Sequence, residues 1–582
     1  MKVLIAWQPA NVDDPAAVFR QTLHAWTGKY ERWTRQKLNV RTSVGDADKN
    51  VGATGLIGLI ASEDQKNDWI ETLQGLAAWA GVCENLPQEP SHVLTQLREN
   101  SPQLVELTGR FTFASLHDGQ LRVTASSVEP LAAWYVEGPR GWAAGTRVQP
   151  LLELVGRSAK PDVAAMSTFA IYGWTVGEHS VFEGVRRVPL GAQLSGTAGK
   201  LKIEQHTPLA RLFAAPEKPL TLADALAQGA ARLKQRVSDE VKLSQSPVLF
   251  LSGGRDSRLI LAAGASCIPP LTTATYGAAD AEEYQCAARV AAAVGAPHRR
   301  MEWLSAAELI TQQTERVTDY VRWSEGTEKI SHLENHLGWF GDERPAQRFT
   351  GLGGEINRGG FYSKYFKGMR KYSARDPQQD IEEVKKHILR RRVERMGGPP
   401  EARELVQQVF QQVDSAAQSL NADVWLWLDM FYFAERTSHW GADGMSAWSW
   451  GGWTWTPFVD RQLIALGRSL THSQRSGDAW PHGLIETLEP RLGGVPYVGL
   501  SWHQKLWRKI LGQKPAPMET AAEQAAIFAA FTRIFGRNDA IWPKLVDEKL
   551  VREMLSSQDR ALAGQKFLWQ LATMELLAQT VF

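Results

Sequence analysis

One stretch near the middle of the chain, residues 248–263, constrains the fold more than any other. It begins with the apolar run Val-Leu-Phe-Leu, which is typical of a buried parallel strand. Gly253 and Gly254 then break the run, and the residues from Asp256 onward have the pattern of a helix. A glycine turn between a buried strand and a helix start leaves backbone N–H groups pointing at one spot, which favours anionic oxygens. The stretch therefore predicts a phosphate-binding turn on a parallel sheet.

Polar side chains within the turn extend this prediction. Ser252 and Ser257 add hydroxyl donors, and Asp256 is a natural magnesium ligand beside a polyphosphate. A bare Gly-Gly would favour an ordinary strand–turn–helix corner, which is the alternative. The full string Ser-Gly-Gly-x-Asp-Ser at residues 252–257 resembles the pyrophosphate loop of ATP pyrophosphatases, which cleave ATP to AMP and pyrophosphate. The resemblance implies ATP and Mg²⁺ as cofactors.

The sequence after the turn indicates the surrounding sheet. Residues 271–277 have the pattern of a second strand, residues 280–294 that of an alanine-rich helix, and His298 begins a third strand. This spacing predicts a doubly wound parallel sheet with ligands at the C-terminal strand ends. Glu282 and Glu283 open the helix; they either match an acidic pair in the relatives or simply complement the helix dipole.

A second glycine-rich constellation lies at residues 349–360, with the sequence Phe-Thr-Gly-Leu-Gly-Gly-Glu-Ile-Asn-Arg-Gly-Gly. It resembles the Gly-x-Gly-Ser-Asp-Glu string of asparagine synthetases, which faces the pyrophosphate loop across the active site. The resemblance implies that Asp256 and Glu355 hold the metal between them as catalytic residues. Arg358 is then a catalytic residue that steadies released pyrophosphate, as Arg258 could. A glycine-rich surface loop is the alternative.

Together the two motifs define the expected nucleotide site, with the adenine beside the strand backbone at Leu251 and at residues 275–277. The residues expected to bind ATP are Leu251, Ser252, Gly253, Gly254, Asp256, Ser257, Thr275, Tyr276, Gly277, Gly353 and Gly354. Leu352 departs from the relatives, because β-lactam synthetases carry a tyrosine there and asparagine synthetases a glutamate. It counts against both of those reactions.

The N-terminal third is expected to form short strands and a few helices, including a helix over residues 67–80. Residues 107–125 predict a β-hairpin. Strands at 130–135 and 141–145 follow, and with residues 182–193 this order resembles the class II glutamine amidotransferase domain of asparagine synthetases. That class uses an N-terminal cysteine, but position 2 is Lys2. We therefore expect no glutaminase activity.

These resemblances predict two domains separated near a proline-containing linker. Residues 1–213 are expected to form a degenerate, α+β, Ntn-hydrolase-like amidotransferase domain. Residues 214–582 are expected to form an α/β, parallel-sheet ATP-pyrophosphatase domain (adenine nucleotide alpha hydrolase-like) with a helical C-terminal part.

Aromatic residues crowd residues 425–455, in a chain that has 23 tryptophans. They predict either a core or, around the glycine-broken residues 446–455, a loop that grips a peptide or planar substrate. The Pro-Phe-x-Asp string at 457–460 resembles the family segment that closes the acceptor side. The relatives place a charge-stabilising lysine after this segment, and His482 and Lys505 are the two candidates for that role.

Composition limits the function further. A net charge of +2 gives no argument for binding nucleic acid or an anionic membrane, and no stretch approaches the length of a membrane span. Three scattered cysteines fit a reducing cytoplasm. The near-neutral charge also disfavours tRNA modification, which other pyrophosphate-loop enzymes perform.

The expected reaction is adenylation of a substrate carboxylate with release of pyrophosphate, followed by attack of an amine to form an amide. Lasso peptide cyclases resemble this layout and give the leading specific hypothesis, with a precursor peptide as partner. The alternatives are amidation of a small natural-product or sugar acid, and a non-catalytic nucleotide-binding scaffold.

Overall fold

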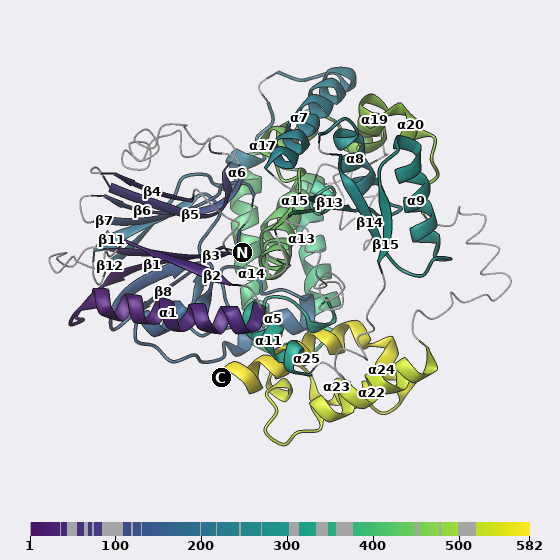
Figure 1. Cartoon of the computed structure of the whole chain (residues 1–582). Helices are drawn as coiled ribbons and strands as arrows, with labels where there is room; N and C mark the ends of the chain where they lie inside the picture. The colour runs from purple at the N-terminus through teal and green to yellow at the C-terminus, as the bar shows by residue number, and fades with distance from the viewer. Residues whose placement is uncertain are drawn as a thin grey trace.

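The computed structural model describes residues 2–34, 37–43, 55–62, 68–72, 75–83, 107, 109–117, 120–129, 131–197, 200–216, 218–243, 246–268, 270–301, 314–332, 347–356, 376–448, 453–476, 479–498 and 520–582. In Figure 1 two stacked sheets occupy the left of the molecule and a third sheet the right. Long helices of the 377–448 region run between them, and helices of the last sixty residues lie along the bottom.

The N-terminal part is built on two six-stranded antiparallel sheets. The first has the strand order β10-β8-β9-β1-β3-β2 and the second the order β12-β11-β7-β6-β5-β4. The strands are β1 (Lys2–Pro9), β2 (Leu38–Thr42), β3 (Leu56–Ser62), β4 (Trp69–Thr72), β5 (Gly75–Cys83), β6 (Gly109–His117), β7 (Gln120–Ala125), β8 (Trp134–Gly138), β9 (Gly141–Gly145), β10 (Arg186–Arg187), β11 (Ala192–Thr197) and β12 (Lys200–Gln205).

Strand β1 shows why these sheets stack. Successive side chains of a strand point to opposite faces. Leu4 and Ala6 pack with residues of the second sheet, whereas Val3, Ile5 and Trp7 pack with the helices on the outer face. Burial on both faces makes β1 apolar throughout. The helices of this part are α1 (Pro15–Thr34), α4 (Val148–Leu154), α5 (Val163–Tyr172) and α6 (Leu209–Leu212).

The third sheet is parallel, with the order β15-β14-β13-β16-β17. Its strands are β13 (Pro247–Phe250), β14 (Thr272–Tyr276), β15 (His298–Met301), β16 (Gln347–Phe349) and β17 (Trp453–Trp455). The chain builds outward from β13 to β15 and then returns to the other side of β13. The strand order therefore reverses between β13 and β16, which is where parallel α/β sheets bind ligands.

Helices complete both parts. The parallel sheet carries α7 (Leu222–Lys242), α8 (Arg255–Gly264), α9 (Glu282–Val294), α17 (Arg461–Arg468), α18 (His472–Ser476), α19 (Ala479–Leu488) and α20 (Pro490–Gly493). The central group is α11 (Thr314–Ser324), α13 (Pro377–Leu389), α14 (Pro400–Ser419), α15 (Val424–Phe431), the π-helices η5 (Arg390–Glu394) and η6 (Tyr432–Gly441), and α16 (Ala442–Trp448). The last helices are α22 (Ala521–Phe535), α23 (Glu548–Met554), α24 (Gln558–Ala563) and α25 (Gln565–Val581). Single 3₁₀ turns lie at η1 (Ile330–His332) and η8 (Trp542–Lys544).

The fold class expected from the sequence is confirmed, with antiparallel sheets first, a parallel sheet next and helices last. The predicted hairpin is the β6–β7 pair, and the predicted strand–helix–strand order after residue 271 is β14, α9 and β15. The predicted helix over residues 67–80 is wrong. This stretch contributes to β4 and β5, because β5 pairs with β6 along its whole length.

A division of the chain at residue 213 stays a prediction. The largest hydrophobic cluster joins side chains from both sides of that position, such as Phe169 of α5 and Leu568 of α25. Among the described helices, none combines the length and apolar character needed to cross a membrane.

Candidate functional site

The loop after β13 is organised by its own serines. The Ser257 hydroxyl accepts from the backbone N–H of Ser252 at 3.0 Å, and the two hydroxyls lie 2.9 Å apart. The Ser252 hydroxyl also accepts from the N–H of Gly254 at 3.2 Å. Gly254 caps α8, so Asp256 stands in the first helical turn beside the positive end of the helix dipole. The expected phosphate loop is therefore a closed turn at a helix N-terminus.

The loop after β16 packs directly against this turn. A β-carbon on Gly354 would lie 2.5 Å from both Cγ and Oδ1 of Asp256, and one on Gly351 would lie 2.9 Å from its Cβ. Gly353 has a φ of +83°, a conformation that side chains rarely adopt. Glycine at these positions lets the two loops meet around Asp256. The structure thus brings together the two motifs that the sequence singled out, although they lie about a hundred residues apart.

Glu355 follows these glycines and is positioned by the π-helix η6. The Tyr432 hydroxyl donates to Oε2 of Glu355 at 3.1 Å. Among the described residues, no group of three or more His, Cys, Asp or Glu side chains is arranged to hold a metal ion. Mg²⁺ at phosphate sites is bound by one or two carboxylates with phosphate oxygens and water. One carboxylate in each facing loop fits that ligand set.

The strand backbone expected beside the adenine is already hydrogen-bonded within the sheet. Leu251 donates its N–H to the Ala274 carbonyl at 2.9 Å and accepts at its carbonyl from the Thr275 hydroxyl at 2.5 Å. Gly277 donates to the Met301 carbonyl at 3.1 Å. Each backbone carbonyl has two lone pairs, so a carbonyl that already accepts one hydrogen bond within the sheet could accept a second one from adenine. Tyr276 stacks on Phe250 and is partly exposed.

Arg258 does not have the pyrophosphate role suggested from the sequence. Its guanidinium is fully buried and donates to the carbonyls of Leu492, Val495 and Pro496. It also lies 4.0 Å from the ring of Tyr497. Burial lowers the pKa of Arg258. Arg258 thus fastens residues 492–498 across the start of α8.

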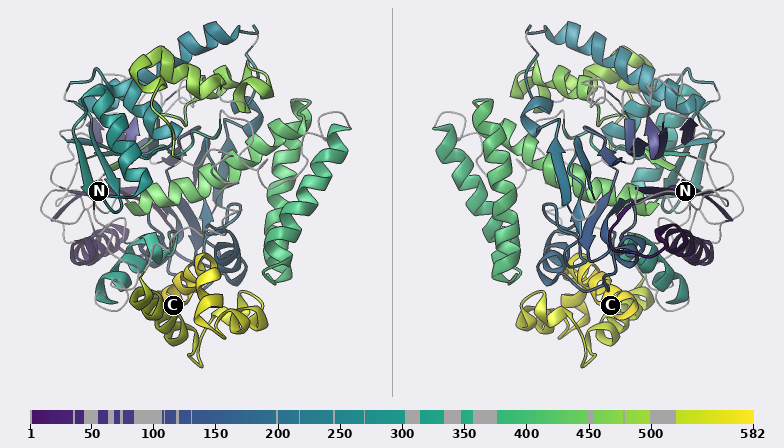
Figure 2. Two further views of the ribbon diagram at one scale, coloured as in Figure 1. Left: turned by 90° about the vertical axis from the view of Figure 1, so that its right-hand side faces the viewer. Right: turned by 90° about the vertical axis from the view of Figure 1, so that its left-hand side faces the viewer.

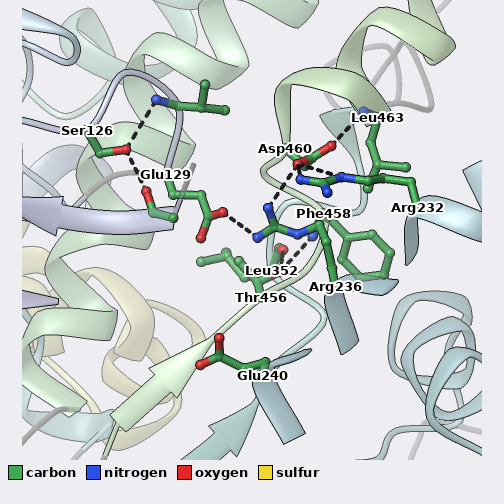
Figure 3. Close-up of polar contacts among 12 residues, drawn as sticks. Ser126, Glu129, Arg232, Arg236, Glu240, Leu352, Thr456, Phe458, Asp460 and Leu463 are labelled. Atoms are coloured by element: carbon green, nitrogen blue, oxygen red, sulfur yellow. Dashed lines mark hydrogen bonds and ion pairs between the residues drawn. The ribbon is translucent and has the colours of Figure 1, made fainter. Parts of the chain in front are cut away.

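The Pro-Phe-x-Asp segment is held by buried charges that join both parts of the chain (Figure 3). Asp460 caps α17 by accepting from the Leu463 N–H at 2.9 Å, and it accepts from Arg232 at 2.6 Å and Arg236 at 2.9 Å. Burial opposes ionisation of Asp460, but the two arginines lower its pKa. Arg236 also pairs with Glu129 of the N-terminal part.

Thr456 links the same segment to the second glycine loop. Its hydroxyl donates to the Leu352 carbonyl at 2.5 Å, while the Leu352 side chain packs beside Gly441 of η6. Trp455, on β17, is buried against Phe349 and Arg236. Trp425 and Trp427 also belong to the core, and Trp440 packs against it. Residues 449–452 of the glycine-broken stretch lie outside the described residues, so a substrate-gripping loop there stays a prediction.

Other sequence candidates take different places. His482 lies on α19, 3.2 Å from Glu486 and 3.3 Å from the Tyr497 hydroxyl. Arg358 and Lys505 lie outside the described residues. Glu282 and Glu283 occupy the first turn of α9, where they complement its dipole.

Lys2, which stands where the glutaminase relatives have cysteine, is tied into the N-terminal sheets. It forms an ion pair with Asp68 and donates to the Gly81 carbonyl at 3.3 Å. Burial lowers the pKa of Lys2, and the attraction of Asp68 opposes this effect.

Sequence analysis missed the role of η6. Tyr432 contacts Glu355 on one side of this helix. The ring nitrogens of His439 lie 2.7 Å from the Ala434 carbonyl of the same helix and 2.5 Å from the Gly177 carbonyl of the N-terminal part, and each carbonyl can only accept a hydrogen bond. Burial, assisted by Arg187, lowers the pKa of His439 to about 3. Burial raises the pKa of Glu435 to about 8. Extended π-helices are rare in proteins, and those that occur are often found at functional sites. The amino-acid types in a sequence do little to predict where a π-helix forms.

Comparison with known proteins supports one part of the chain directly. Residues 229–326, which hold the first glycine loop, match the family model described as asparagine synthase. That family is ATP-dependent, and the match supports an ATP-dependent ligase that forms carbon–nitrogen bonds. No curated protein matches the chain.

Two solved structures are similar over part of the molecule. They are titled the allosteric regulatory enzyme of purine biosynthesis and the glutamine phosphoribosylpyrophosphate amidotransferase from B. subtilis with ADP and GMP. Their TM-scores are 0.23 and 0.22, each at 12% identity over 52% of this chain. The chain spans 65% of the length of each.

Proposed function

We propose that the protein is an ATP-dependent ligase that adenylates a substrate carboxylate, releases pyrophosphate, and joins the acyl group to an amine. The observation that carries the proposal is the contact of two glycine loops around Asp256 at the point where the parallel strand order reverses. Ligands of parallel α/β sheets bind at this place. The asparagine synthase match over residues 229–326 supports the same reaction class.

In this proposal the phosphates of ATP lie over residues 252–257, where α8 begins. Its dipole and the serine hydroxyls stabilise negative charge that develops as pyrophosphate leaves. Asp256 and Glu355 would hold Mg²⁺, which neutralises phosphate charge when bound. Tyr432 keeps Glu355 oriented through its hydrogen bond. Gly353 and Gly354 let backbone approach the phosphates closely, and Arg358 remains our candidate for steadying the leaving group.

The acyl donor and the amine define the finer proposal. Lys2 replaces the glutaminase cysteine, so we propose that the amine does not come from glutamine. A lasso-peptide-type macrocyclisation, in which a precursor peptide supplies both carboxylate and amine, is the specific reaction we favour. Amidation of a small natural-product or sugar acid is the second candidate, because Leu352 only disfavours asparagine synthesis and β-lactam formation.

Release of AMP and pyrophosphate from ATP–Mg²⁺ tests the reaction class, with candidate acids or cell extract as substrate. We expect substrate-dependent AMP formation that falls by about a thousandfold or more in Asp256→Ala. Asp239→Ala, which removes a half-exposed carboxylate of α7 that pairs with Lys242 far from the glycine loops, is the matched control and should keep full activity. Formation of ADP would overturn the mechanism, and nucleotide binding without turnover would favour a scaffold.

A further inference from the structure

A cavity of about 960 Å³ lies on the far side of η6 from the glycine loops. It opens between α14 and the N-terminal part, at the level where β12 and α6 leave the second sheet. Figure 2 shows α13 and α14 as a helical pair at the side of the molecule, with α15 and η6 running inward from it. The volume is at the upper end for small-ligand pockets.

The two walls of this cavity differ in chemistry. Residues of the 189–212 region, including Leu190, Pro208 and Leu209, give an apolar wall. The opposite wall is a face of α14 with Gln408, Gln411, Gln412, Ser415 and Ser419. The three glutamine side chains are exposed and form no hydrogen bond with the described residues. Each amide group can both donate and accept, as a peptide bond does.

The charges around the cavity leave one side chain open to a ligand. Arg187 lies at the wall, where it is buried and pairs with Asp443 at 2.6 Å, while its Nε and Nη1 have no hydrogen-bond partner among the described residues. His439 is neutral at pH 7, since burial lowers its pKa to about 3. Glu178 also lines the cavity, and its carboxylate has no hydrogen bond or ion pair with the part of the chain that the structure describes. Arg186 and His179 act on it only at longer range.

An unpaired, partly buried carboxylate is costly, and it favours a cationic partner. Burial raises the pKa of Glu178, which is the signature of this cost. A ligand that carries an ammonium or guanidinium group would relieve it. The neutral amides and the apolar wall give no corresponding site for a phosphate or a nucleic acid. The charge of Arg187, the one arginine in the described lining, is already balanced by Asp443.

The cavity also lies within reach of the proposed reaction centre. Tyr432 of η6 contacts Glu355, while the next residues, Phe433 and Ala434, line the cavity. A helix with its side chains is about 10–12 Å across. A peptide that passes round half the circumference of such a helix covers about 16–19 Å, which takes about five or six extended residues at about 3.3 Å each.

We propose that this cavity binds an extended peptide segment, whose backbone pairs with the α14 glutamines and whose cationic group meets Glu178. The idea that this peptide is part of the substrate rests on the proposed ligase function. The idea that the cavity binds such a peptide does not. The peptide is anchored on one side of η6 while its reacting carboxylate reaches the glycine loops on the other side.

A library of random tetrapeptide amides, one half of it N-acetylated, is incubated with the nucleotide-free full chain and analysed by mass spectrometry to test the proposal. We expect the retained peptides to be enriched in lysine, arginine or a free N-terminal amine. Glu178→Gln should reduce that preference about tenfold, the value of a charge-assisted hydrogen bond of about 1.4 kcal/mol. The variant should not lower thermal stability, because it removes an unpaired charge.

Two tryptophan substitutions on α14 locate the binding. Gln411→Trp fills the cavity and should abolish retention, whereas Gln407→Trp lies four residues earlier, is exposed, and does not line it. Retention without cationic enrichment, enrichment that survives Glu178→Gln, or equal loss in both tryptophan variants would each overturn the proposal. Asp256→Ala separates the two hypotheses, because it should abolish AMP formation and leave peptide retention unchanged.

Discussion

The glycine loops around Asp256 keep their polar groups partly exposed, whereas the charges around Arg236 are buried on all sides. Arg236 and Asp460 are each 2% exposed, and Glu129 is 3% exposed. Side chains in the loops can still exchange their partners for those of a ligand. The buried charges cannot, since each one depends on the others for its compensation. Polar residues of the same types thus stay accessible to solvent in one region and join distant parts of the chain in the other.

Replacement of Arg236 should separate the two regions most strongly. Arg236→Met removes one buried arginine from Glu129 and one of the two arginines on Asp460. Breaking a buried pair costs about 3–5 kcal/mol, which we expect as a loss in the free energy of unfolding by urea. Arg232→Met is the control, because Arg232 is more exposed and Asp460 keeps Arg236. Equal losses in both variants would contradict the prediction.

A methyl group in the glycine loops should affect activity and not stability. Gly354→Ala places a β-carbon against Asp256 at 2.5 Å, and the backbone there has an ordinary φ. We expect AMP formation to fall about a hundredfold, equivalent to about 2.7 kcal/mol, because Asp256 must move. Gly28→Ala on α1, where nothing lies within 4 Å of the new atom, is the matched control. A loss of stability comparable to that of Arg236→Met would remove the contrast between the regions.

Taken per pH unit, the smallest expected effect is a change in how stability depends on pH. Burial raises the pKa of Glu435 to about 8 from 4.5, so the folded protein keeps a proton that the unfolded chain has released. Stability should therefore fall as pH rises from 4.5 to 8, by at most about 1.4 kcal/mol per pH unit from this group. Glu435→Gln should flatten the pH profile of the melting temperature. Its amide oxygen can still accept from the Gly177 N–H.

Burial also raises the pKa of Asp429 and Asp443 to about 6. Their contributions remain in the Glu435→Gln variant and end at lower pH. Between pH 6 and 8 Glu435 is therefore the one of these three carboxyls that still changes stability, so the slope in that window should be lost in the variant. An unchanged slope in that window would show that Glu435 is ionised in the folded protein.

Local signals explain why much of the parallel sheet was predictable. The apolar run before Ser252, the glycines and the helix start are all encoded within sixteen residues, and each agrees with the others. Strands β4 and β5 were not predictable in the same way, because the alanines of β5 favour a helix. Pairing of β5 with β6 overrides that preference. Gly81, with a φ of +104°, lets the two backbones approach closely.

Local sequence patterns predicted only part of the candidate site. Both glycine motifs were evident, but the contact between Gly354 and Asp256 depends on the strand order. Arg258 has the position expected of a phosphate ligand, yet its partners lie more than two hundred residues later. The cavity behind η6 joins Glu178 to α14 across a similar separation. These contacts join residues that are far apart in the chain. They result from tertiary packing, and no local sequence pattern predicts them.

One contact also sets a constraint on the evolution of this chain. The Val498 N–H donates to the Gly253 carbonyl at 3.1 Å, and its side chain fills the space where any β-carbon on Gly253 would stand, 1.8 Å from Cγ2. Selection cannot change the two positions independently. A descendant that acquires a larger residue at 253 must first shorten or displace residue 498, so the C-terminal third restricts which phosphate loops the lineage can sample.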